Sequence, residues 1–228
     1  MSREFFSLLT NFSSLSILLP LCVGVYRSVA VKPSRLSQVQ NRIFVLVLVG
    51  VFFELLAQSF SLPIWEWLTG ESRNLPGAHL FTVVQFGLFV WIYKELIGQW
   101  SGKLWVALII VFALIGLANG LYYDGFRNLN PTTRALEAIL LLIVIIGYFY
   151  NLLRQETLVR LEREPLFWTS AGLVIYLSGS LLVFLVSNIF LSNEGTYDVL
   201  WALFGIHSLL NILLNLSLAM ALWIRYPK

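Results

Sequence analysis

Long apolar runs, separated by short polar breaks, organise the whole chain. An α-helix needs about 20 apolar residues to cross the hydrocarbon core of a bilayer, and each run is close to that length. The pattern therefore predicts a seven-helix transmembrane bundle, with spans over residues 5–29, 43–62, 78–96, 104–123, 135–153, 166–191 and 200–224. Because the breaks leave no room for a separate soluble domain, residues 1–228 are expected to form one all-α membrane domain.

The prolines agree with this division of the chain. Pro20 lies inside the first span, whereas the other prolines fall in breaks or at the edges of spans, where a missing N–H group is tolerated. We therefore predict that the first helix bends near Pro20. The first run is not followed by a small-residue cleavage site, so we expect a retained helix and not a signal peptide.

Composition identifies the solvent of this surface. The chain is 58% hydrophobic and only 12% charged, whereas soluble domains carry about 25% charged residues. This small number of charges cannot cover a surface that faces water. We therefore expect the lipid bilayer to be the partner of this surface. This composition excludes most soluble enzymes and nucleic-acid-binding proteins, although the net charge is +3.

The basic residues predict the orientation. Of the 15 lysines and arginines, Arg3, Arg73, Arg127 and Arg134 fall on one side of the predicted bundle, and the others fall on the opposite side. Short cytoplasmic loops carry the excess of Lys and Arg. We therefore expect an integral protein of the bacterial inner membrane, with its N-terminus outside and its C-terminus in the cytoplasm.

Polar side chains within the spans are the candidates for a functional site. Ionisable groups inside a membrane are costly and often functional, and Glu54 is the clearest of them. At 1.5 Å per residue, Glu54, Gln85 and His207 all lie roughly 10–12 Å below the outer end of the bundle. We predict an outward-facing pocket that binds a small ligand, formed by Glu54, Gln85, His207, Asn211, Asn119, Glu137 and Asn188.

Structural roles remain open for several of these residues. His207, Asn211 and Asn215 are spaced four apart and share one helix face. Such polar side chains also join membrane helices by hydrogen bonds. Glu54 has a similar alternative, as a protonated carboxyl bonded to a neighbouring helix. His79 lies near the outer surface, where we interpret it as an ordinary boundary residue.

Few enzyme chemistries fit the sequence. The last span has no lysine for a retinal Schiff base, and no G-x-S-x-G, H-E-x-x-H or P-loop pattern occurs. The single cysteine, Cys22, excludes an internal disulfide. We therefore expect no cofactor, no catalytic residue and no metal ligand. A mixed metal site of Glu54, Glu137, His79 and His207, serving an intramembrane enzyme, remains a third hypothesis.

A resemblance points to a signalling role. Several stretches of the chain resemble the multi-helix membrane input modules of bacterial sensor histidine kinases. They are the run from His79 to Phe86, the run from Arg163 to Ser180, the pair Ser187 and Asn188, and the asparagines Asn211 and Asn215. The resemblance implies a signal-input fold with a kinase on the cytoplasmic side, whereas the printed sequence has no kinase domain after Ile224. Either the signal passes to a separate partner, or the chain is an excised or stand-alone relative whose role has diverged. We expect a receptor-like sensor that signals to a separate cytoplasmic or membrane partner. The second hypothesis is a transporter of a small solute, with possible proton coupling through Glu54.

Overall fold

The computed structural model of the protein describes residues 3–30, 38–59, 75–94, 102–123, 130–154, 160–191 and 197–224. Side chains are described for all of these except residues 59, 75–76, 187–191, 197–198 and 200. Within these ranges the chain is helical, without a strand. Its elements are α1 (Arg3–Ser16), α2 (Leu18–Ala30), α3 (Gln38–Ser59), α5 (Leu75–Tyr93), α6 (Gly102–Tyr122), α7 (Pro131–Leu153), the short 3₁₀ helix η2 (Leu161–Arg163), α8 (Pro165–Leu191) and α9 (Tyr197–Trp223).

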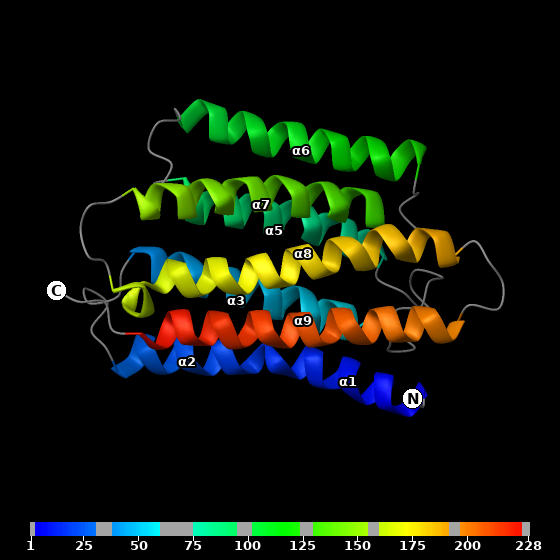
Figure 1. Ribbon diagram of the computed structural model, residues 1–228, viewed down its shortest axis with the longest axis horizontal. Coiled ribbons are helices and arrows are strands. Elements are labelled where there is room, and N and C mark those ends of the chain that lie inside the picture. Colours follow the sequence, from blue (N-terminus) through cyan, green and yellow to red (C-terminus); the bar gives the residue numbers. More distant parts are fainter. Residues whose placement is uncertain are drawn as a thin grey trace.

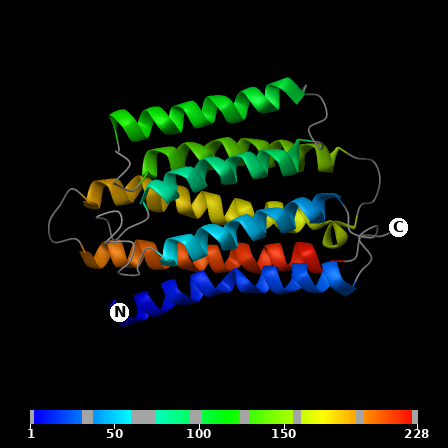
Figure 2. The ribbon, with the colours of Figure 1, turned by 180° about the vertical axis from the view of Figure 1, so that it is seen from behind.

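The helices run back and forth between the two ends of one elongated bundle (Figure 1). We call the end where α1 and α9 begin the N-terminal end, and the end where α2 and α9 finish the C-terminal end. Helix α9 packs against α8, α1, α2 and α3, whereas α6 packs against α5 and α7 at the margin of the bundle. Seen from behind, α3 and α5 lie on the rear face of the bundle (Figure 2).

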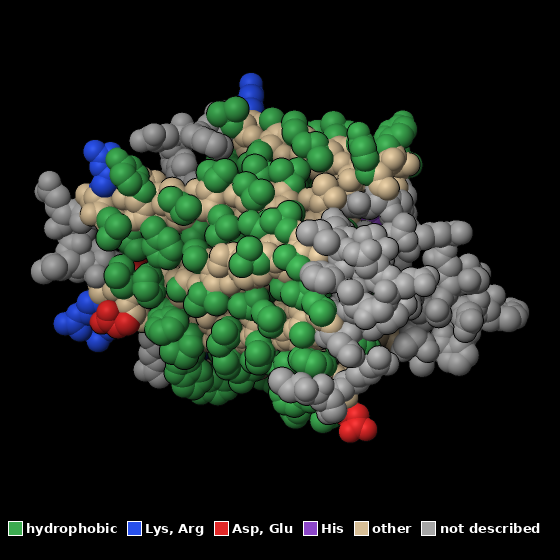
Figure 3. Space-filling view, turned by 45° about the vertical axis from the view of Figure 1, so that its right-hand side comes forward, with side chains coloured by type: hydrophobic (Ala, Val, Ile, Leu, Met, Phe, Trp, Pro, Cys, Tyr) green, Lys and Arg blue, Asp and Glu red, His purple; other side chains and the backbone are tan. Residues whose placement is uncertain are grey.

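Length and apolarity indicate an integral, multi-pass membrane protein. Within the described residues, six helices are long and apolar enough to cross a membrane, and α5 adds a shorter apolar helix. The first of the six, Glu4–Ala30, combines α1 and α2. Large hydrophobic side chains are exposed along the bundle, among them Phe52, Leu114 and Ile146. Apolar side chains cover the face shown in Figure 3, and charged ones lie at its margins.

The helix boundaries depart from the sequence prediction most at α3, at α5 and at α7, which begins at Pro131, four residues before the predicted start at Ala135. Helix α3 begins at Gln38, several residues before the predicted start at Ile43, and α5 covers Leu75–Tyr93 instead of residues 78–96. Residues 60–62 and 95–96 of the predicted spans lie outside the described residues. The extra turn of α3 carries polar side chains that bind other helices. The predicted span started too late because it was defined by its apolar residues alone.

The first predicted span is interrupted between α1 and α2. Helix α1 ends at Ser16, α2 begins at Leu18, and the amide of Leu21 donates to the carbonyl of Ile17 across 3.3 Å. A proline ring clashes with the carbonyl four residues earlier, which for Pro20 belongs to Ser16. The interruption therefore lies where Pro20 disturbs the helix, in agreement with the predicted bend.

Buried polar side chains hold the C-terminal end together. Gln40 is fully buried, and its Nε2 atom donates to the carbonyls of Ala221 and Ile224 at 3.0 and 2.8 Å. Arg27 donates to the Ile224 carbonyl across 3.3 Å. The last carbonyls of a helix lack partners within that helix, and cations are stabilising beside them. The C-terminus of α9 is therefore capped by side chains of α2 and α3.

Candidate functional site

Side chains of six helices surround a cavity of about 250 Å³ that extends from the N-terminal part of the bundle to beyond its middle. Three predicted site residues line it, namely Glu54 of α3, Gln85 of α5 and Asn211 of α9. All three are half-buried. The cavity thus brings together residues that are far apart in the sequence, and two of them, Glu54 and Gln85, were predicted to lie at similar depths.

The wall formed by α1 and α9 is joined by hydrogen bonds. Asn211 donates to the hydroxyl of Ser13 across 2.9 Å, and Asn215 donates to the hydroxyl of Ser16 across 2.7 Å. Both asparagines therefore share one face of α9, as their spacing predicts, and that face meets α1. Their amides join helices and also line the cavity, so the structural and the binding interpretations apply together.

We expect the bond between Asn215 and Ser16 to stabilise the bundle only modestly. Hydrogen bonds between membrane helices average about 0.6 kcal/mol in double-mutant cycles. The cycle of Asn215→Ala, Ser16→Ala and the double variant should give a coupling energy of about that size, measured by unfolding in mixed detergent micelles. A coupling energy of zero would show that the two side chains do not interact.

Arg134 is a cavity residue that the sequence analysis assigned to a loop. Helix α7 begins at Pro131, so Arg134 lies in its first turn and is half-buried at the cavity wall. Its Nε atom donates to Asn130 Oδ1 across 3.3 Å, and its Cζ atom lies 5.7 Å from the centroid of the Phe184 ring. Proline favours the first position of a helix, and this signal could have placed Arg134 inside the span.

A second set of side chains lies beside the cavity without lining it. Glu137 is only 5% exposed, and its Oε1 atom has no hydrogen-bond partner within the described part of the chain. His207 Nδ1 lies 3.1 Å from the hydroxyl of Ser180, and its ring lies 5.5 Å from that of Tyr176. Tyr176 does line the cavity, and it was not predicted. Glu137 and His207 therefore occupy a layer next to the cavity wall, which corrects their predicted place inside the pocket.

Asn119 belongs to a different polar network at the same end. It is buried between α6 and α7, where its amide donates to the hydroxyl of Thr133 across 3.0 Å. The amide of Asn130 likewise donates to the hydroxyl of Thr82 across 3.0 Å. His79 is also buried, which corrects its interpretation as a boundary residue. Asn119 thus does not line this cavity but a separate pocket formed by α6 and the start of α7, and the side chain of Asn188 lies outside the described ones.

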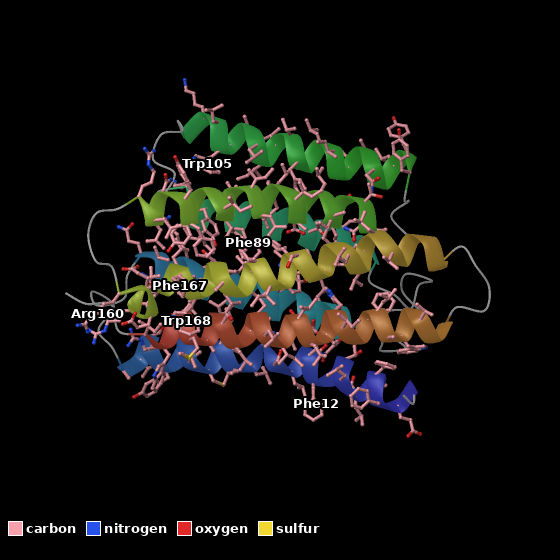
Figure 4. The ribbon with its side chains drawn as sticks, in the orientation of Figure 1. Phe12, Phe89, Trp105, Arg160, Phe167 and Trp168 are labelled. Carbon is pink, nitrogen blue, oxygen red and sulfur yellow. The ribbon has the colours of Figure 1, made fainter. Side chains whose placement is uncertain are left out.

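The cavity offers hydrogen-bonding groups and one side chain of each charge. Its lining combines Glu54 and Arg134 with the amides of Gln85 and Asn211. Phe89 lies near the middle of the bundle and forms part of the apolar inner wall (Figure 4). Among the described residues, no three side chains of His, Cys, Asp or Glu come together as metal ligands. This chemistry is suited to holding a small polar molecule.

Comparisons of the chain with protein-family models, with curated proteins and with solved structures found no match. The functional argument therefore rests on the geometry of the cavity and on the residues that line it.

Proposed function

We propose that the protein is a receptor-like membrane sensor that binds a small ligand in the cavity between α1, α3, α5, α7, α8 and α9. The observation that carries this proposal is the convergence of Glu54, Gln85, Arg134 and Asn211 on one cavity. Polar groups in a membrane protein are costly and mark binding sites or pathways. Ligand pockets typically combine an apolar wall with a few convergent polar groups.

In this proposal the chain forms seven transmembrane spans, with α1 and α2 as the first and α5 as the third. The N-terminal end of the bundle faces the outside of a bacterial inner membrane. Support comes from the basic residues in the described ranges. Arg3 and Arg134 lie at the N-terminal end, and the remainder are at the C-terminal end, namely Arg27, Arg42, Lys94, Lys103, Arg154, Arg160 and Arg163. Excess basic residues are typical of the cytoplasmic side.

The inner wall of the cavity favours a sensor over a transporter. Leu46, Val47, Phe89 and Leu218 line the cavity toward the middle of the bundle. Farther toward the C-terminal end, Ile43, Ile92 and Leu222 belong to the tightly buried core. A ligand that enters from the N-terminal end therefore meets packed apolar side chains and not a polar path. We propose that binding is passed to a separate partner, as the resemblance to kinase input modules implies.

Cysteine labelling tests whether the cavity is open to water from outside. In a Cys22→Ser background, Ser14→Cys should react with a charged, membrane-impermeant thiosulfonate reagent added to spheroplasts. Ser14 lines the cavity, and a thiol reacts as its thiolate, which forms in water. Leu15→Cys is the matched control, because Leu15 lies at the same depth and is 57% exposed on the apolar surface.

We expect Ser14→Cys to react at least ten times faster than Leu15→Cys. Equal rates at the two positions would contradict a water-filled cavity. Labelling of Ser14→Cys only in inverted vesicles would reverse the proposed orientation. Substrate flux into proteoliposomes, abolished by Glu54→Gln, would instead assign the cavity to a transporter.

A further inference from the structure

The cavity carries an acid and a base that do not neutralise one another. Within the described part of the chain, Glu54 and Arg134 form no ion pair with each other or with another side chain. Glu54 accepts a hydrogen bond from Gln58 across 3.2 Å, and the guanidinium of Arg134 contacts Asn130 and the Phe184 ring. Glu137, one turn along α7, lies near Arg134 but not on the cavity wall. Charges in apolar surroundings need partners, so a ligand with both charges complements this cavity.

Aromatic rings lie on the Glu54 side of the cavity. The rings of Phe53 and Phe81 both line it, with their centroids 5.0 Å apart. An ammonium group is attracted to the face of an aromatic ring and to a carboxylate. Glu54 and the two rings therefore form a position that suits a ligand ammonium group. Arg134, on α7, suits a carboxylate or phosphate, which a guanidinium recognises through paired hydrogen bonds.

The inward part of the cavity is mainly apolar. Along α3 its lining runs from Ala57, near the N-terminal end, to Leu46, which corresponds to roughly 16 Å along the helix axis. Apolar side chains form most of its inward end, including Val47, Phe89 and Leu218, and the amide of Asn215 lies beside them. The volume of about 250 Å³ is just below the range of roughly 300–1,000 Å³ that is usual for drug-sized ligands. The charges thus lie toward the opening, and a short apolar group fits beyond them.

We propose that the ligand is a small zwitterion with an apolar tail. Its acidic group binds Arg134, its ammonium group lies between Glu54 and the Phe53 and Phe81 rings, and its tail points toward Phe89. This inference rests on the proposed binding function and names its ligand class. A free apolar amino acid has this chemistry, and so does the head group of a single-chain ethanolamine phospholipid.

Calorimetric titration of the full-length protein in nanodiscs tests the proposal with four probes. They are L-leucine, 4-methylpentanoate, which lacks the amine, 3-methylbutylamine, which lacks the carboxylate, and lysophosphatidylethanolamine. We expect leucine to bind at least tenfold more tightly than either single-charge analogue. The same selectivity for the phospholipid, with no binding of leucine, would assign the site to a lipid head group and retain the zwitterion chemistry.

Two variants assign each charge to its partner. Glu54→Gln should lower the affinity for leucine about tenfold or more and leave that for 4-methylpentanoate within twofold. Arg134→Gln should likewise lower the affinity for leucine about tenfold or more and leave the affinity for 3-methylbutylamine within twofold. The matched controls are Glu162→Gln and Arg160→Gln, because both side chains are exposed at the opposite end of the bundle. These controls should bind leucine as the unmodified protein does.

The outcomes separate this inference from the proposed function. Equal affinities for leucine and 4-methylpentanoate, or no binding of either zwitterion, would overturn the ligand class. If Ser14→Cys is nevertheless labelled from outside, the cavity is open and the binding function stands without this ligand. If Ser14→Cys is not labelled and no probe binds, both proposals fail. The comparison among probes needs no variant, so it holds even where a substitution prevents folding.

Discussion

Replacing Gly172 by valine is expected to destabilise the bundle more than any other single change proposed for it. Helices α8 and α9 pack closely here, because a Cβ atom added to Gly172 would lie 2.5 Å from the Cβ atom of Ser217. Small residues allow such close approach of membrane helices. Overpacking typically costs about 1–3 kcal/mol and occasionally more. A valine at position 172 can be accommodated only if the backbones of α8 and α9 move apart. We therefore expect Gly172→Val to lower the free energy of unfolding by an amount at the upper end of that range.

Gly147→Val is the matched control for this prediction. A Cβ atom added to Gly147 of α7 would meet nothing within 4 Å. The free energy of unfolding, measured by titration with sodium dodecyl sulfate in mixed micelles, should therefore hardly change for the control. If both variants lose the same stability, the close approach of α8 to α9 at Gly172 is wrong.

Replacing Gln40 by methionine is expected to have the second largest effect. Methionine has a similar length but cannot donate a hydrogen bond, so the Ala221 carbonyl would lose the donor that Gln40 supplies, and the Ile224 carbonyl would keep Arg27 as its donor. A buried polar group without a partner costs about 1–3 kcal/mol. We expect a loss of that size in the free energy of unfolding, measured by the same titration.

Gln38→Met provides the control on the same turn of α3. Gln38 is exposed, whereas Gln40 is fully buried, so the same chemical change should have little effect there. Thermal unfolding followed by tryptophan fluorescence gives a second measurement. Similar melting temperatures for the two variants would contradict the capping of α9 by Gln40.

Hydrophobic runs predicted where the helices lie because the bilayer imposes both their length and their apolarity. The same reasoning misjudged polar residues at helix ends. Gln40 and Arg42 were assigned to a break, although both are buried and α3 includes them. Arg42 donates to the carbonyl of Trp91 on α5 across 2.9 Å. Such a contact depends on which helices are neighbours in the bundle. The periodicity of apolar residues along a single helix does not contain that information.

The candidate site was predictable to the extent that depth defines it. The rise per residue placed Glu54, Gln85 and His207 in one layer; of these, Glu54 and Gln85 line the cavity, together with Asn211, one turn beyond His207 on α9. Tyr176 could not be found in this way, because a tyrosine within an apolar run does not stand out. His207 was placed at a suitable depth, but its rotation about α9 depends on contacts with α8.

Helix α9 connects the cavity mechanically to the opposite end of the bundle. Asn211 lines the cavity, and the carbonyls that Gln40 binds lie at the far end of the same helix. Between Asn211 and Trp223 the helix contains neither proline nor glycine, and sharp kinks usually need such residues. A tilt or rotation imposed at Asn211 is therefore expected to travel as rigid-body motion over roughly 18 Å. Under the proposed sensor function, this rigid segment of α9 is the element through which binding in the cavity would change the C-terminal end of the bundle.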